Sequence, residues 1–271
     1  KDIIASRTRR LNILIEELNA MVERHGDERR SDINKMPLSM DREDLIEERA
    51  IAITLTDDNY IRHVPVETFR IQNRGGKGLK GVATKDEDSP QSIVTCFSKD
   101  RLLIFTNLGR VYGLKAWETP QGSRHSRGTH IRNLLENLQD DEDIVSILPI
   151  SKDIVDEVTE KCLKVKLEEG EKRPSSGYFL LFATKLGLIK KTDLHEYVRI
   201  NRNGKYALRF KLENDSLVNV QQSVDTDDVV MISTTGYASR FKCEAIRTSG
   251  RVSGGVYGIK VADRKGSGGG F

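Results

Sequence analysis

Residues Ile104-Phe-Thr-Asn-Leu-Gly109-Arg-Val-Tyr112 form an apolar run, a Thr, two further residues, a Gly and a second run of β-forming residues. Gly and Asn tolerate the positive φ of a tight hairpin turn, and β-branched and aromatic residues favour strands. The stretch therefore predicts a β-hairpin that turns at Gly109. The same pattern returns three times, in Ile53-Thr-Leu-Thr-Asp-Asp-Asn59-Tyr-Ile-Arg62, Phe182-Ala-Thr-Lys-Leu-Gly187-Leu-Ile-Lys190 and Ile232-Ser-Thr-Thr-Gly236-Tyr-Ala-Ser-Arg240.

These four turn residues define a repeat. Successive turns are 50, 78 and 49 residues apart, so the second interval carries about 28 extra residues. The extra residues fall in an acidic stretch from about 152 to 176, which we expect to be a surface excursion between repeats. Units of about 50 residues built from short strands predict a mainly β, propeller-like architecture. We place this domain at residues 49–271, with four repeats.

The first 26 residues predict an α-helix that ends at Gly26. Apolar residues recur on one helical face, at Ile4, Leu11, Ile15, Leu18 and Val22. Such a stripe requires a packing partner, either the rest of this chain or a second helix in a coiled coil of which this is the C-terminal end. The start at Lys1 favours the coiled coil. Residues 27–48 are charged and contain Pro37, which predicts a linker with one short helical turn at 42–47.

The composition excludes several classes of protein. The chain has 271 residues, 37% apolar and 31% charged, and its longest apolar stretches, such as 178–183, are far shorter than the roughly 18 residues of a membrane span. Its three cysteines lack Cys-x-x-Cys spacing, and we find no His-Glu-x-x-His helix and no Gly-rich phosphate loop. We therefore expect no membrane span, no catalytic residue and no metal site.

Basic residues recur with the repeat. The fifteenth residue after each turn is Arg, and the eighteenth is Lys or Arg in the first three repeats. Residues 60–85, 110–133, 185–211 and 237–260 together carry a net charge of +19, whereas the whole chain carries +3. Acidic residues are therefore concentrated elsewhere. A basic surface repeated along a fold indicates binding to a phosphate backbone.

Duplex DNA is the expected ligand of this surface. Arg and Lys contact phosphates without reading bases, and aromatic residues are not interleaved with the cations as binding of single strands requires. Two alternatives remain. Either the recurring arginines pair with acidic segments inside the fold, or the basic rim belongs to a scaffold that binds acidic protein partners.

One segment resembles a known family motif. Gln72-Asn73-Arg74-Gly75-Gly76-Lys77-Gly78 is similar to the gyrase A box, Q-R-R-G-G-K-G, of the C-terminal domain of DNA gyrase A subunits, with Asn73 where Arg is usual. Segments 26–33, 105–112, 123–128 and 200–205 also resemble that family, so the resemblance covers nearly the whole chain. The related topoisomerase IV subunit, whose box is typically degenerate or absent, is the alternative.

The resemblance implies a β-pinwheel that wraps duplex DNA on its basic rim with positive handedness and presents the segment to be transported. It also implies a cytoplasmic, nucleoid-associated holoenzyme: an ATP-dependent type IIA topoisomerase of two A and two gyrase B subunits that introduces negative supercoils. ATP and Mg belong to the partner subunit, so no cofactor is expected here. The family's nucleophilic Tyr follows an Arg, and no Tyr of this chain does, so cleavage chemistry lies outside it.

Twelve basic residues are the predicted phosphate contacts. They combine the recurring fifteenth and eighteenth positions with neighbouring cations of the same segments. They are Arg74, Lys77, Lys80, Arg110, Arg124, Arg127, Lys190, Lys191, Arg202, Lys205, Arg240 and Arg251. Within the box, Gly75, Gly76 and Gly78 are expected to supply a tight turn and a close backbone approach, which a Cβ would block.

Overall fold

A computed structural model describes residues 2–27, 42–69, 74, 89–123, 126–165 and 173–261. The chain divides into two compact units, residues 1–41 and 42–271. We call them the helical unit and the β unit. No helix in the described ranges has the length and apolarity that crossing a membrane requires.

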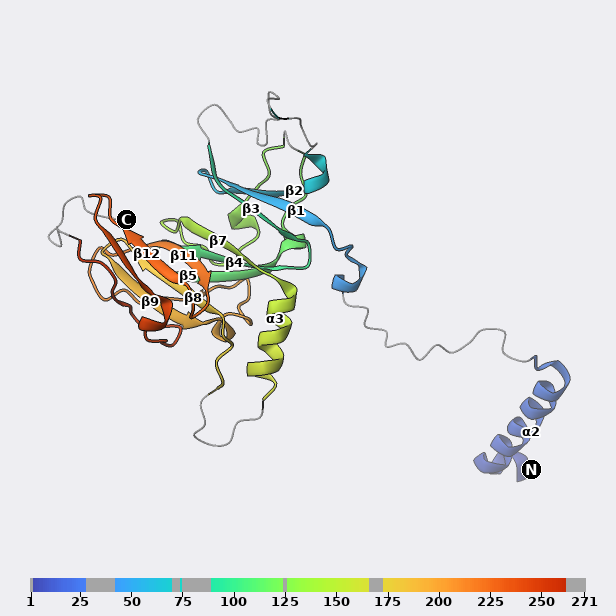
Figure 1. Ribbon diagram of the computed structural model, residues 1–271. Helices are drawn as coiled ribbons and strands as arrows, with labels where there is room; N and C mark the ends of the chain where they lie inside the picture. The colour runs from blue at the N-terminus through green and yellow to red at the C-terminus, as the bar shows by residue number, and fades with distance from the viewer. Residues whose placement is uncertain are drawn as a thin grey trace. The chain divides into compact units, whose positions relative to one another are not determined.

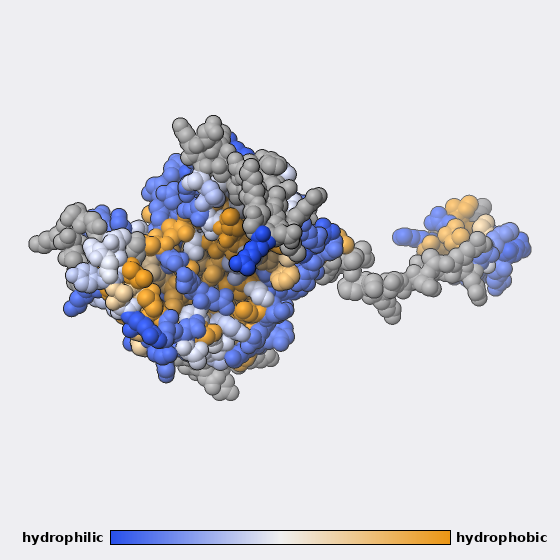
Figure 2. Space-filling view, turned by 45° about the horizontal axis from the view of Figure 1, so that its top comes forward, coloured by the Kyte–Doolittle hydropathy of each residue, from blue (hydrophilic) through white to orange (hydrophobic). Residues whose placement is uncertain are grey.

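The helical unit contains α1 (Asp2–Ala5) and α2 (Arg7–His25). Ser6 separates them because its backbone is extended and its hydroxyl accepts the Arg9 N–H as an N-cap of α2. The prediction of one continuous helix is therefore wrong at Ser6, whereas Gly26 is the C-cap as expected. Figure 2 shows apolar residues gathered on one side of this unit. The apolar residues of the predicted stripe are exposed.

Four antiparallel hairpins form the β unit, as the repeat predicts (Figure 1). Their turns hold Asn59, Gly109, Gly187 and Gly236 at φ of 60°, 74°, 85° and 86°, the left-handed region that Gly and Asn favour. The hairpin strands are β1 (Ala50–Thr56) with β2 (Tyr60–Pro65), β4 (Arg101–Thr106) with β5 (Arg110–Lys115), β8 (Phe179–Thr184) with β9 (Leu188–Asp193), and β12 (Asp228–Ile232) with β13 (Ala238–Lys242).

Three of these hairpins grow into four-stranded sheets, which we call blades 1, 2 and 3. The third strand comes from the same repeat and pairs with the first hairpin strand: β3 (Pro90–Phe97), β7 (Ile144–Ile150) and β11 (Leu217–Ser223). The fourth comes from the following repeat and pairs with the second hairpin strand: β6 (Thr129–His130), β10 (Lys205–Tyr206) and β14 (Val256–Tyr257). The second, third and fourth repeats are thus each hydrogen-bonded into the blade before them.

The turn residues also receive the following repeat. The carbonyl of Asn59 accepts the N–H of Ile131, and that of Gly109 accepts the N–H of Ala207. The carbonyl of Gly187 likewise accepts N–H groups of Gly258 and Ile259. A left-handed turn residue exposes its carbonyl, and an incoming chain satisfies it. The recurring Gly or Asn therefore closes a hairpin and docks the next repeat.

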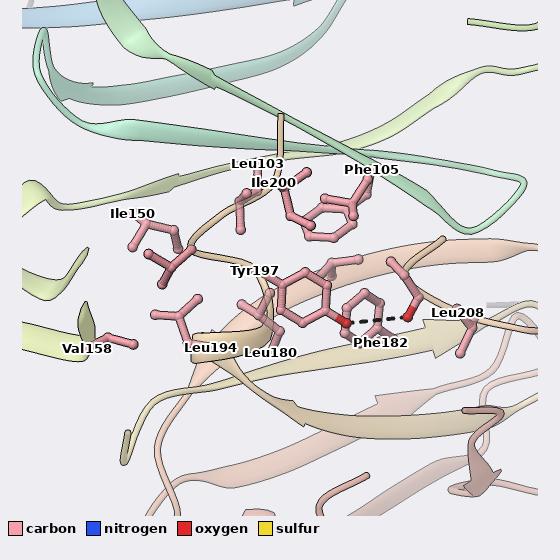
Figure 3. Close-up of a cluster of buried hydrophobic side chains, with 14 of the residues drawn as sticks. Leu103, Phe105, Ile150, Val158, Leu180, Phe182, Leu194, Tyr197, Ile200 and Leu208 are labelled. Atoms are coloured by element: carbon pink, nitrogen blue, oxygen red, sulfur yellow. Dashed lines mark hydrogen bonds between the residues drawn. The ribbon is translucent and has the colours of Figure 1, made fainter. Parts of the chain in front are cut away.

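Three hydrophobic clusters lie between the sheets. In β4, Leu102 and Ile104 belong to the cluster with blade 1, whereas Leu103 and Phe105 belong to the cluster with blade 3. Both faces of this strand are buried, which explains its unbroken apolar run. In the cluster shared by blades 2 and 3, the rings of Phe105 and Phe182 pack edge to face with centroids 5.5 Å apart (Figure 3).

The acidic insertion differs from its prediction as a surface excursion. It begins with α3 (Lys152–Val158), which continues as one π-helical stretch, Thr159–Leu163. Val158 and Cys162 are fully buried in the cluster between blades 2 and 3. The prediction is wrong for this half of the insertion, because an apolar residue every fourth position gives its helix a face that packs.

Short 3-10 turns complete the β unit, at Arg42–Leu45, Val66–Thr68, Ala116–Glu118, Ile131–Asn133, Leu194–Glu196 and Cys243–Ala245. The first confirms the helical turn expected near 42–47. Residues at the end of the predicted linker already contact the β unit: Lys115 pairs with Glu43 at 2.9 Å, and the Ser98 hydroxyl donates to the Glu47 carbonyl at 2.8 Å. The linker therefore ends before residue 48.

Candidate nucleic-acid interface

Three crossover segments, residues 119–130, 197–206 and 246–257, carry five of the twelve predicted cations: Arg124, Arg127, Arg202, Lys205 and Arg251. Each segment leaves a 3-10 turn of its own repeat and ends in the short strand that it adds to the preceding blade. The recurring fifteenth and eighteenth positions lie on these segments, which explains why cations return there. The corresponding segment of the first repeat includes the box and lies outside the described residues, except for Arg74, which is exposed in a turn.

Arg127 and Lys205 are predicted cations of the crossover segments that are open to solvent. Arg127 is exposed, and its guanidinium carbon lies 3.9 Å from the centroid of the Tyr60 ring in blade 1. Lys205, in β10, is also exposed. Stacking on an aromatic ring fixes the direction of the Arg127 side chain without removing its charge. Both side chains are available to an anion.

The other recurring arginines are partly engaged. Arg202 is 44% exposed and its Nη2 lies 2.5 Å from Oε1 of Glu118, a carboxylate outside the acidic segments. Arg251 donates from Nη1 to the carbonyl of Tyr206 at 2.7 Å. Because Tyr206 follows Lys205, this bond brings two cations of successive repeats together. A pair of cations from two blades is suited to a ligand that runs across the blades.

Arg110 is held inside the β unit and was wrongly predicted as a phosphate contact. Its side chain is 13% exposed, and its Nη1 lies 3.1 Å from Oε2 of Glu142, whose side chain is fully buried. The same carboxylate accepts the hydroxyl of Thr106 at 2.6 Å and that of Tyr112 at 3.1 Å. A buried carboxylate requires such partners, so Arg110 stabilises the fold.

Lys190 and Lys191 are 2% and 3% exposed, so their prediction as phosphate contacts is also wrong. The Lys190 ammonium donates to the carbonyls of Ala207, at 2.6 Å, and Arg251. The Lys191 ammonium pairs with Asp225 and donates to the carbonyl of Cys243. Both cations lie over aromatic rings: Nζ of Lys190 is 5.0 Å from the ring centroid of Phe182, and Nζ of Lys191 is 4.1 Å from that of Phe179. The hydrogen-bond partners of both lysines are distant in the sequence, so the sequence pattern alone did not reveal that these side chains are buried.

Stability is expected to rise with pH because of Lys190. Burial lowers the pKa of Lys190 from 10.5 to about 7, with Arg251 adding to the effect and Glu196 opposing it. Between about pH 7 and 10.5 the unfolded chain retains a proton that the folded chain has lost, so the free energy of unfolding increases with pH. Urea unfolding at pH 7, 8 and 9 should show this rise in the wild type and a weaker one in Lys190→Met. Parallel curves for the two proteins would contradict it.

A family model described as "DNA gyrase C-terminal domain, beta-propeller" matches residues 51–95, 100–151, 178–223 and 227–267. The matches coincide with the four repeats and omit the insertion. The chain belongs to this family. This match confirms the mainly β, propeller-like fold class that the repeats and the resemblance predicted.

Related proteins support the assignment to this gyrase family. The DNA gyrase A subunit of Staphylococcus epidermidis is 38% identical over 264 residues, and that of Staphylococcus aureus strain MRSA252 is 37% identical over 262. These alignments cover 97% and 96% of this chain and 27% of each relative, so the chain spans about a quarter of their length.

Solved structures share the fold of this gyrase domain. The C-terminal domain of DNA gyrase A superposes with a TM-score of 0.58 at 21% identity, covering 82% of this chain and 63% of the other. The C-terminal domain of DNA topoisomerase IV superposes with the same TM-score at 22% identity, covering 83% and 60%.

Several predicted contacts lie outside the described part of the gyrase domain: Lys77, Lys80, Arg124 and the box residues Gln72, Asn73, Gly75, Gly76 and Gly78. Arg240 is described on β13, where it is 72% exposed and paired with Asp228. Arg199 and Arg247, two exposed cations on the crossover segments, were not predicted from the sequence. The high positive charge of these segments, rather than a recurring position, could have identified them.

Arg62, the third residue after the first turn, was also not predicted from the sequence. It is 2% exposed, and burial lowers its pKa. Its Nη1 donates to the carbonyls of Ser123, at 2.8 Å, and Ser126, both on a crossover segment.

Within the ranges described, no group of three or more His, Cys, Asp or Glu side chains could hold a metal ion.

Proposed function

We propose that this chain is the part of a DNA gyrase A protein that binds and wraps duplex DNA. The family match, one match per repeat, is the observation that carries the proposal. The crossover segments supply the surface. We assign the phosphate contacts to Arg74, Lys77, Lys80, Arg124, Arg127, Arg202, Lys205, Arg240 and Arg251, and add Arg199 and Arg247.

Strand exchange supports a track for DNA along the blades. Each crossover segment ends on the blade before its own, so cations recur at every junction between blades. Cations spread over several blades offset the cost of bending a duplex, which is on the order of 1–6 kcal/mol for 40–90° over 20–30 bp. Contacts to phosphates carry no base sequence, so binding is expected to be insensitive to sequence.

The chain then acts within a larger enzyme. We propose an ATP-dependent type IIA topoisomerase that introduces negative supercoils, formed by two gyrase A and two gyrase B subunits in the cytoplasm at the nucleoid. The gyrase B partner would bind ATP and Mg and supply the energy of the cycle. The chain itself would contribute the bend of the DNA and its handedness. A topoisomerase IV protein is the alternative, supported by likeness of fold alone.

Salt dependence tests the proposed contact surface. If six of the assigned cations each neutralise one phosphate, log Kobs should fall with log[salt] at a slope of about −5. Fluorescence anisotropy with a labelled duplex of about 100 bp, between 50 and 300 mM KCl, measures this slope. A second duplex of unrelated sequence should bind with the same affinity.

A slope near zero would contradict the proposal, because few phosphates would then be neutralised. Saturable binding to an acidic protein together with weak, length-independent DNA binding would favour the scaffold alternative. Affinity that differs strongly between the two duplexes would contradict readout through phosphates alone.

A further inference from the structure

Lys190 is a buried residue that links the main chains of two repeats at their crossover segments. Its ammonium donates to the carbonyl of Arg251, which lies on the segment of the fourth repeat, and to the carbonyl of Ala207, which directly follows the segment of the third. The Tyr197 hydroxyl also donates to the Ala207 carbonyl, at 3.4 Å, the bond drawn as a dashed line in Figure 3. Lys190 itself is 2% exposed, so it lies too deep to reach a ligand on the surface.

Arg62 occupies the equivalent position in blade 1. Both residues are third after their turn and sit on the second strand of a hairpin. Arg62 donates to the carbonyls of Ser123 and Ser126, which immediately precede Arg124 and Arg127. Its Nε lies 3.3 Å from Oγ1 of Thr54 on the neighbouring strand, which helps to fix the guanidinium.

In blade 2, other residues bind the main-chain carbonyls of the next crossover segment. Its third residue after the turn is Tyr112, and the cations that reach the next crossover segment are Arg101 and Arg110. Arg101 donates to the carbonyl of Ile200, and Arg110 approaches that of Asn203 at 3.5 Å. These two carbonyls flank Arg202. In all three blades a cation of the blade thus binds main-chain carbonyls beside a cation on the following crossover segment.

We propose that Lys190 and Arg62 are positioning residues for DNA binding: each holds the main chain of the loop that presents the phosphate contacts of the next repeat. This inference rests on the proposed function. The strands that end these loops are two residues long, so few ladder hydrogen bonds fix the loops. A buried cation with two carbonyl partners restricts the loop and reduces the ordering entropy lost when DNA binds.

The arrangement also fixes the spacing between successive contacts. The Lys190 ammonium ties Arg251 to the residue that follows Tyr206, and the Arg251 guanidinium returns to the Tyr206 carbonyl. Arg251 and Lys205 therefore belong to one small network that spans two repeats. Cations that are held in place before binding lose less freedom when a phosphate backbone binds them.

A double-mutant cycle on the whole chain tests this coupling. Lys190→Met, Arg251→Ala and the double variant are titrated against a labelled 100 bp duplex over a range of salt, with circular dichroism to show that each is folded. Loss of one phosphate contact lowers the salt slope by about 0.9, which is roughly eightfold in affinity at 0.1 M salt relative to 1 M. We expect each single variant to lose about this much and the double variant to lose no more.

Lys191→Met is the matched control. Lys191 neighbours Lys190 on the same strand and is equally buried, but its ammonium contacts Asp225 and the Cys243 carbonyl, which lie outside the crossover segments. It should alter stability and leave the salt slope unchanged. If Lys190→Met does not fold, the same cycle is made with Arg62→Met and Arg127→Ala in blade 1.

Three results would overturn the inference. In the first, Lys190→Met keeps wild-type affinity and slope while Arg251→Ala loses both. In the second, the losses multiply to roughly sixtyfold in the double variant, so the two residues act independently. In the third, Lys191→Met lowers the slope as much as Lys190→Met. Failure of the wild type to bind DNA would instead remove the proposed function and this inference with it.

Discussion

A closed circular plasmid relaxed by a type I topoisomerase in the presence of this chain is expected to retain positive linking-number changes after the protein is removed. Wrapping with positive handedness constrains positive crossings, and relaxation of the free DNA then leaves them in the product. The change should grow with protein concentration until the plasmid is covered. Two-dimensional agarose gels with an intercalator measure its sign and size.

The double variant Arg74→Ala/Lys77→Ala should lower this change by more than half. It removes the recurring cations of the first repeat, and a wrap requires contacts along the whole arc to offset the bending energy. The control is Lys152→Ala/Lys164→Ala, which removes the same charge from the insertion. DNA binding without any linking-number change would mean that the surface contacts DNA without chiral wrapping, and an equal loss in both variants would exclude a special role of the box.

Gly187→Ala is expected to destabilise the β unit by about 2–5 kcal/mol. Its φ of +85° costs a Cβ-bearing residue about 1–2 kcal/mol, and an added Cβ would lie 2.4 Å from the carbonyl oxygen of Ile259. Relief of that contact must displace the residues that directly follow the crossover segment of the fourth repeat, which adds about 1–3 kcal/mol. Urea denaturation followed by circular dichroism measures the loss.

Gly236→Ala provides the comparison. Gly236 has the same position in its hairpin and a φ of +86°, but an added Cβ would meet no atom within 4 Å. It should therefore cost about 1–2 kcal/mol, the conformational part alone. Equal losses for the two variants would show that docking of the next repeat on Gly187 contributes nothing measurable.

Local chemistry made much of the fold predictable. A turn that needs positive φ selects Gly or Asn, so Asn59, Gly109, Gly187 and Gly236 revealed four hairpins and their spacing. The third strands were not separately predicted, and exchange of the fourth strand was not predicted at all. A two-residue strand such as β6 has no periodicity to detect, and its partner lies in another repeat.

The sequence also could not separate the cations that face solvent from those that are buried. Recurring spacing identified Arg127, Lys205 and Arg251 on the crossover segments. Lys190 and Lys191 have the same charge and are buried, and Arg110 is only 13% exposed. Lys190 is buried because the carbonyls of Ala207 and Arg251 meet at its ammonium.

The sequence by itself thus determined the hairpins and their repeat, because turn conformation and strand preference depend on neighbouring residues. It also determined the positive charge of the segments that follow each turn. Only the tertiary structure decided which cations face solvent and which hold the loops. A buried ammonium is stable only where carbonyls or carboxylates surround it, and here those groups come from residues up to 61 positions away.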